Sequence, residues 1–122
     1  MAFEGVTQNF SAVASADLSA LQYTAVIFDT SGDIAAAASG KNCDGILQDA
    51  PKSGQAGNVA ISGISKAVLG GSGATAGDQL EITTGGVFQT KSSGTAVAKA
   101  LATGVSGDII SVLLYKGNAV YA

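Results

Sequence analysis

Histidine, arginine and tryptophan are absent from this chain of 122 residues, and cysteine and proline occur once each. Because histidine is the most common general base in enzymes, its absence excludes serine–histidine and cysteine–histidine catalytic arrangements. All six cationic side chains are lysines, and the net charge is -3. Nucleic-acid binding depends on a clustered basic face and favours arginine for contacts to base edges. We therefore expect no nucleic-acid partner.

The groups that remain for chemistry are Cys43 and nine carboxylates. The neighbouring Asp44 raises the pKa of a thiol, so Cys43 is interpreted as a structural residue. One cysteine with carboxylates is also a poor ligand set for zinc. Asp29 and Asp33 offer oxygen ligands for calcium, but their spacing departs from an EF-hand loop. Most acids fall in predicted turns, and none lies in the apolar setting that a glycosidase acid requires. We expect no catalytic, cofactor-binding or metal-binding residues, no cofactor and no enzymatic activity.

No apolar run approaches the ~20 residues that a membrane-spanning helix needs, so we expect no membrane segment. Ala14-Ser15-Ala16 has the form of a signal-peptidase site, but no lysine or arginine precedes Lys41. A secretory signal is therefore not predicted. A single cysteine allows no intrachain disulfide, which fits assembly in a reducing cytoplasm.

Small side chains dominate the composition, with 22 alanines and 17 glycines against 7 aromatic residues. Burial stabilises a fold by roughly 25 cal/mol per Å² of apolar surface, so small side chains give a thin core. The length fits one compact domain. The sequence therefore predicts a single domain that gains stability by self-association.

Residues 1–20 show no sustained period of two or 3.6 and are interpreted as an extended N-terminal arm or irregular lead-in. A β-rich domain is expected at residues 21–122, where β-branched and aromatic runs alternate with turn signals. Two hairpins are predicted, one turning at 29–33 and one at 84–86. The other strands are expected at 45–48, 59–69, 95–102 and 109–115.

Three of these strands carry further signals. Gly63 lies inside the run 59–69 and marks a bulge or a bend. The alanine-rich residues 95–102 fit a helix on propensity alone, but we favour a strand. In the last run, apolar residues of both parities indicate burial on two sides. Together the patterns predict a mainly β fold, a single small barrel-like or sandwich-like domain of about eight short strands.

Short segments in a fixed order resemble the small capsid decoration (cement) proteins of tailed bacteriophages. They are DLSALQY at 17–23, GILQ at 45–48, VAISGISK at 59–66, AGDQL at 76–80 and GDIISVLL at 107–114. The resemblance spans residues 15–115. It implies a compact β-fold on the outer surface of the head, in the virion, after synthesis in the host cytoplasm. It also implies homotrimers at three-fold and quasi-three-fold positions that bind the major capsid protein and stabilise the expanded shell.

The N-terminal arm carries the candidate capsid-contact residues Phe3, Val6 and Phe10, which we expect to order on docking. The alternative for this segment is an ordinary edge strand or a frayed terminus. An alternative function of a different class is an attachment module that binds host glycans. Such a module needs a groove with exposed aromatic side chains.

Overall fold

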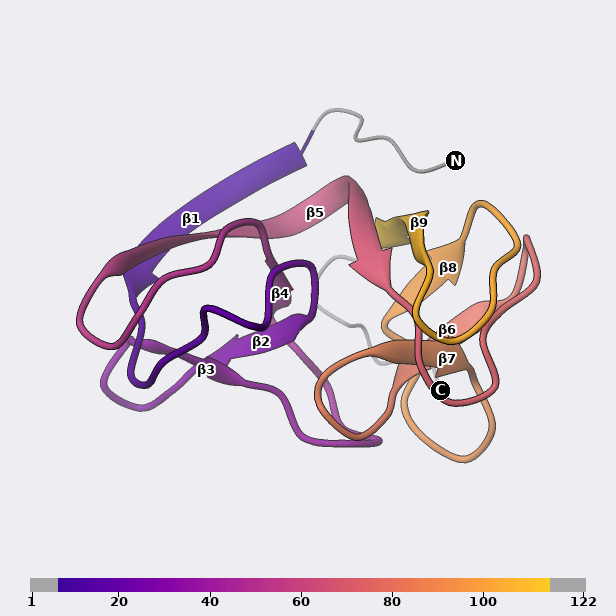
Figure 1. Cartoon of the computed structure of the whole chain (residues 1–122), viewed down its shortest axis with the longest axis horizontal. Helices are drawn as coiled ribbons and strands as arrows, with labels where there is room; N and C mark the ends of the chain where they lie inside the picture. The colour runs from indigo at the N-terminus through magenta and orange to yellow at the C-terminus, as the bar shows by residue number, and fades with distance from the viewer. Residues whose placement is uncertain (1–6, 115–122) are drawn as a thin grey trace.

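The computed structural model describes residues 7–114, and within that range the chain forms nine β-strands and no helix (Figure 1). The strands are β1 (Thr7–Val13), β2 (Ala25–Phe28), β3 (Ile34–Ala36), β4 (Gly45–Leu47), β5 (Ala56–Val68), β6 (Gln79–Ile82), β7 (Phe88–Thr90), β8 (Ala98–Ala100) and β9 (Ile109–Leu114). All named pairs are antiparallel and join into one curled sheet of order β3-β2-β4-β5-β9-β8-β6-β7, with β1 added to β5. The mainly β, barrel-like prediction is confirmed.

Both predicted hairpins are present. Phe28 faces Ile34 across the turn 29–33, and Ile82 faces Phe88 across the turn 83–87. The segment 95–102 contains the strand β8 rather than a helix. Its burial alternates, with Ala98 and Ala100 buried and the lysine between them exposed. That period of two suits a strand with one covered face, and packing decides the structure over the helix propensity of alanine.

The segment before residue 21 differs from its prediction. Thr7–Val13 is a regular strand that pairs with β5 from Ala56 to Gly63, and the following Ala14 lies in a core cluster. Apolar and polar residues alternate in a strand when one of its faces is buried. Residues 8–13 of β1 are exposed or half-buried, so the sequence shows no such alternation. Of the two interpretations of this segment, the structure agrees with the alternative, an ordinary edge strand, at residues 7–13, and not with an irregular lead-in.

β5 is the longest strand, and it bends at Gly63, whose φ is 100°. The register against β1 shifts between Gln8 and Asn9, which leaves Ile61 as the extra residue of a bulge. The bend predicted at this glycine is confirmed. Before the bend β5 lies between β1 and β4, and after it β5 pairs with β9 (Figure 1). One strand thus serves both halves of the molecule.

The two halves repeat one five-strand arrangement, which we call the first unit (β1–β5) and the second unit (β5–β9). In the first unit the hairpin β2–β3 is followed by β4, which pairs with β2 and with β5. In the second unit the hairpin β6–β7 is followed by β8, which pairs with β6 and with β9. The last strand of each unit also pairs with its first strand, β5 with β1 and β9 with β5. A parallel bridge closes each unit, Ala14 with Ile34 in the first and Leu69 with Phe88 in the second.

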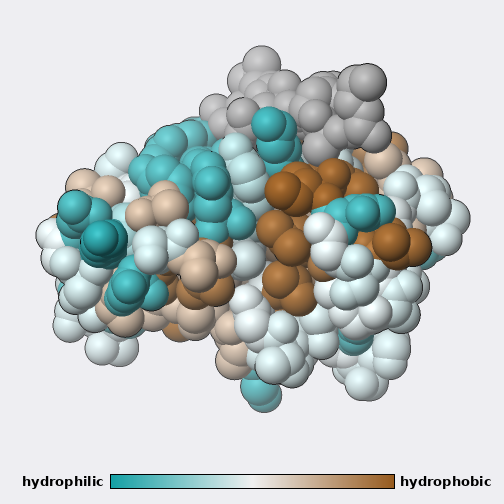
Figure 2. Space-filling view, in the orientation of Figure 1, coloured by the Kyte–Doolittle hydropathy of each residue, from teal (hydrophilic) through white to brown (hydrophobic). Residues whose placement is uncertain are grey.

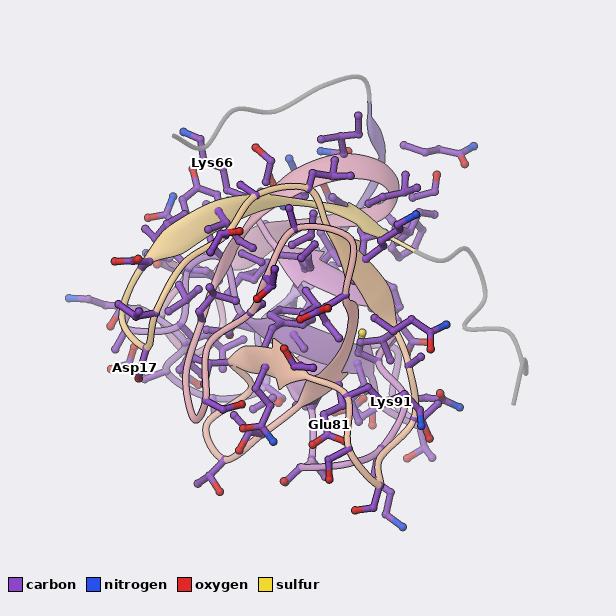
Figure 3. The ribbon with its side chains drawn as sticks, turned by 90° about the vertical axis from the view of Figure 1, so that its right-hand side faces the viewer. Asp17, Lys66, Glu81 and Lys91 are labelled. Carbon is purple, nitrogen blue, oxygen red and sulfur yellow. The ribbon has the colours of Figure 1, made fainter. Side chains whose placement is uncertain are left out.

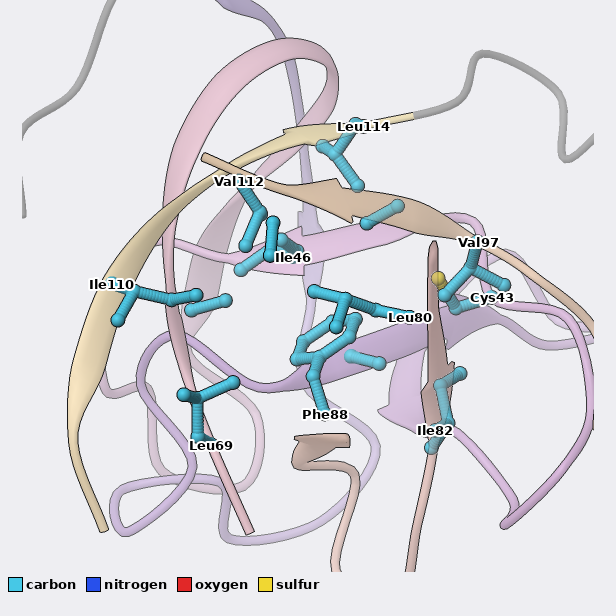
Figure 4. Packing of buried hydrophobic residues seen from close by; sticks show 14 of the residues in the cluster. Cys43, Ile46, Leu69, Leu80, Ile82, Phe88, Val97, Ile110, Val112 and Leu114 are labelled. Carbon is cyan, nitrogen blue, oxygen red and sulfur yellow. The ribbon is translucent and has the colours of Figure 1, made fainter. Parts of the chain in front are cut away.

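Backbone hydrogen bonds repeat between the units as well. Ser15 donates its N–H to the Ile34 carbonyl, and Gly70 donates to the Phe88 carbonyl, both at 2.9 Å. The core of the second unit, which we call the second core, is the buried cluster around Leu80, Phe88 and Val112. It holds inward residues of the second unit and also the outward-pointing Ala25, Ile46 and Ala60 of the first. Figure 4 shows Ile46 among the side chains of the second core. The outer face of the first unit is therefore one wall of the second core, and the two units form one body.

Candidate interaction surface

The thiol of Cys43 lies inside the second core and is 3% exposed. Burial, and secondarily the charge of Asp44, raises the pKa of Cys43 to about 12. A thiol with this pKa is protonated at neutral pH and is not a nucleophile. The interpretation of Cys43 as a structural residue agrees with this position.

Asp29 and Asp78, two acids of the predicted turns, accept hydrogen bonds from backbone N–H groups. Asp29 accepts from Ser31 and Asp33 at 2.9 and 3.0 Å, and Asp78 accepts from the Thr75 N–H at 3.0 Å and the Thr90 hydroxyl at 2.8 Å. These bonds lower the pKa of Asp78. Among residues 7–114 no three cysteine, aspartate or glutamate side chains gather closely enough to hold a metal ion. In the same range no helix is long and apolar enough to cross a membrane.

Glu81 is a buried carboxylate that the sequence does not reveal. It is 6% exposed and accepts hydrogen bonds from the Gln89 amide at 2.6 Å and from the Ser92 and Gly94 N–H groups at 3.1 and 2.6 Å. The Gln89 bond, the two backbone bonds and the nearby Lys91 lower the pKa of Glu81 against the opposing effect of burial (Figure 3). A carboxylate held ionised in this way organises a loop and is a poor general acid.

An exposed apolar face lies on the second unit. Ile64 pairs with Leu113 and Val68 with Ile109 across β5 and β9, so these four side chains share one side of the sheet. Ile109 is 43% exposed and Leu113 is 38% exposed. Leu101, just after β8, and Val105, in the loop before β9, are exposed apolar residues of the same unit.

The prediction for the last strand is corrected by this face. Ile110, Val112 and Leu114 are buried, whereas Ile109 and Leu113, of the opposite parity, are exposed. The sequence predicts cover on both sides of β9, but within residues 7–114 large side chains of only one parity are covered. A strand that is apolar on its solvent side is typical of an interaction surface.

The first unit carries polar residues at two of the corresponding positions. Ile64 corresponds to Asn9, because each lies five residues before the closing bridge of its unit, at Leu69 and Ala14. Leu101 corresponds to Gln48, since each donates its N–H to the last strand of its unit. Figure 2 shows hydrophobic residues gathered over the end of β5 and over β9, and hydrophilic residues over β1 and the start of β5. The two units share a backbone but present different chemistry.

Of the three candidate contact residues, only Phe10 lies in the described range. It projects from β1, is 53% exposed and meets Phe28 edge-on, with ring centroids 5.1 Å apart. Phe10 is thus part of a regular strand and not of a flexible arm. Phe3 and Val6 lie outside the described residues.

The architecture defines a small all-β protein of two barrel-like units that share a strand. It is similar to the N base of the head fiber protein gp8.5 of bacteriophage phi29, with a TM-score of 0.74 over 90% of this chain and 95% of that chain. Sequence identity is 16%, so the likeness shows a common fold. No protein-family model matches this chain, and no curated protein matches it in sequence.

Proposed function

We propose that the protein is a structural protein of a phage head, a decoration protein that binds the outer surface of the shell. The observation that carries the proposal is the fold shared with a phage head fiber base along nearly the whole of this chain. The exposed apolar face of the second unit supports it, because apolar side chains gathered on an exposed face mark sites of association. The partner is the major capsid protein, and the protein catalyses no reaction.

Repetition of the binding site suits this role. A shell presents the same contact many times in a symmetric array, so an oligomer that engages several sites at once binds with avidity beyond that of one contact. A homotrimer at three-fold and quasi-three-fold positions meets this condition. A modest apolar face, such as that around Ile109, is then enough for stable occupancy and for stabilisation of the expanded shell.

Phe3, Val6 and Phe10 remain proposed capsid-docking contacts, made with the shell or with a neighbouring copy on it. The pairing of β1 with β5 gives Phe10 a fixed base, and its half-exposed ring offers apolar area beside Phe28. Aromatic side chains of this kind are frequent anchors in protein interfaces.

Binding of the isolated protein to purified phage heads tests the proposal. We expect saturable binding to expanded heads and little binding to unexpanded ones. Failure to bind heads, together with specific binding on a glycan array, would favour an attachment module instead.

A further inference from the structure

The two units contact each other within the chain. Gly40 donates its N–H to the Ile82 carbonyl at 2.7 Å, and the Gln48 amide donates to the Ser65 hydroxyl at 2.9 Å. Through such contacts the outer face of the first unit covers the inward side of the second. We call this side of either unit its open side, whether or not another unit covers it. Ser65, Ala67 and Ile82 of that open side are at most 1% exposed.

The first unit has the same open side, and no part of residues 7–114 covers it to this extent. Phe10 and Ala12 lie four and two residues before the bridge at Ala14, as Ser65 and Ala67 lie before the bridge at Leu69. Phe28 begins the first hairpin turn as Ile82 begins the second. Phe10 is nevertheless 53% exposed, and Ala12 and Phe28 are only half-buried.

The second unit, in turn, has an outer face that nothing in residues 7–114 covers. In the first unit the face is a row across three strands, in which Ala25 pairs with Ile46 and Ile46 pairs with Ala60. The corresponding row of the second unit is Gln79, Lys99 and Leu113, paired in the same order. Ala25, Ile46 and Ala60 are fully buried, whereas Gln79, Lys99 and Leu113 are all exposed.

At two positions, the covered surfaces carry apolar side chains where the uncovered surfaces carry charges of opposite sign. Ile46 of the covered outer face corresponds to Lys99 on the uncovered one. Val97 of the covered open side corresponds to Asp44 on the uncovered one, because Val97 donates its N–H to Leu80 as Asp44 donates to Val26. Ile46 and Val97 belong to one core, and the positions that correspond to them on the two uncovered surfaces carry opposite charges, Lys99 and Asp44. Opposite charges at corresponding positions favour contact and fix its register.

We propose that a second copy of this chain docks on the open side of the first unit and repeats the internal contact between molecules. The outer row Gln79, Lys99 and Leu113 of one copy covers Phe10, Ala12 and Phe28 of the next, and Lys99 lies near Asp44. The contact joins two different surfaces head to tail, so successive copies close into a ring or extend as a filament. The inference rests on the self-association in the proposed function and names the surfaces that make it. Phe10 and Leu113 contact the neighbouring copy, and Val68 and Ile109 of the apolar face stay available to the shell.

A mixing experiment with the full chain tests the head-to-tail contact without any phage head. Phe10→Asp removes one surface and Leu113→Asp the other, so native mass spectrometry should show each variant alone as a monomer. An equimolar mixture should give a heterodimer, because one intact pair of surfaces remains, and no larger species. Wild type should form a closed ring or a longer series.

Several outcomes would overturn the inference. They are a monomeric wild type, assembly that survives both substitutions, and a mixture that gives no heterodimer although both variants melt cooperatively. If Phe10→Asp does not fold, Phe10→Gln takes its place. Lys99→Glu should weaken assembly by more than about tenfold, which is ~1.4 kcal/mol, while Lys52→Glu on the first unit should not. None of these results depends on head binding, so each leaves that assay to decide the proposed function separately.

Discussion

Tyr23 and Gly77 occupy the same position in the two units, and both have a positive φ, 67° and 94°. Tyr23 donates its N–H to Leu47 at 2.7 Å, and Gly77 donates to Ala100 at 2.8 Å, at corresponding places in β4 and β8. The backbone therefore needs a left-handed residue here in both units. Glycine adopts this conformation without steric cost, whereas tyrosine stores strain of about 1–3 kcal/mol. Contact of the Tyr23 ring with the second core, and with the Lys66 ammonium 5.6 Å from its centroid, offsets that strain.

Gly77→Ala should lower the free energy of unfolding by about 1–2 kcal/mol, because a Cβ is strained at this φ. Steric crowding makes no contribution, since no heavy atom lies within 4 Å of the added Cβ. Gly77→Asn should be less costly, because asparagine tolerates the left-handed region better than alanine. Urea denaturation measures both variants. Equal stability of wild type and Gly77→Ala would contradict the backbone requirement.

Glu81→Gln should lower stability at neutral pH by roughly 1–3 kcal/mol, since the carboxylate accepts three hydrogen bonds in a buried site. The pKa of Glu81 is lowered from its ordinary 4.5, so the unfolded state binds the proton more tightly. The stabilising contribution is complete above the ordinary pKa and is lost as the pH falls through the folded pKa.

Thermal melts over a range of pH check this sign. Wild type should lose stability below about pH 4.5, where the unfolded chain begins to bind a proton at Glu81 that the folded protein resists, and Glu81→Gln should lose less over the same range. Lys91→Gln removes a nearby charge without touching the hydrogen bonds and should change the profile little. An identical acid profile for wild type and Glu81→Gln would mean that another group controls acid stability.

Cys43 should be inert to a thiol reagent in the folded protein at mildly alkaline pH. Its pKa of about 12 and its place in the second core leave little thiolate and little access. Complete reaction is expected once denaturant unfolds the chain. Rapid labelling of the native protein would place the thiol outside the core.

Phe88→Ala should destabilise the whole chain by roughly 3–5 kcal/mol, as large-to-small changes in a packed core do. Phe88 is fully buried in the second core, which also holds Ala25 and Ile46 of the first unit. The two units should therefore unfold in one transition, and amide exchange should quicken in β2 as well as in β7. Separate transitions for the two units would contradict a shared core.

The strands from Tyr23 onward could be predicted because most combine a buried face with a turn signal at their ends. β1 could not, since its residues are largely exposed and show no alternation. The repeat of the two units is also hidden from the sequence. Backbone hydrogen bonds define it, while corresponding side chains differ as widely as Tyr23 and Gly77 or Ile46 and Lys99.

The candidate surface was only partly visible in the sequence. The apolar pattern of residues 109–114 indicates cover on both sides, and the structure shows which parity the chain itself covers. The burial of Glu81 depends on a loop eleven to thirteen residues further along the chain, a non-local contact that strand periodicity cannot reveal. Phe10 was identified as a candidate, but its place in a strand beside Phe28 follows from pairing with β5.

Head binding by a pair of matched variants tests the central claim most directly. Ile109 in the second unit and Ala56 in the first are both exposed and occupy corresponding positions. Ile109 pairs with Val68 and Ala56 pairs with Val13, the residues just before the closing bridges at Leu69 and Ala14. Ile109→Asp should reduce occupancy of expanded heads by more than about tenfold, the equivalent of ~1.4 kcal/mol, with an unchanged melting temperature, while Ala56→Asp should bind like wild type. Equal occupancy by Ile109→Asp and wild type would show that the apolar face of the second unit does not hold the protein on the head.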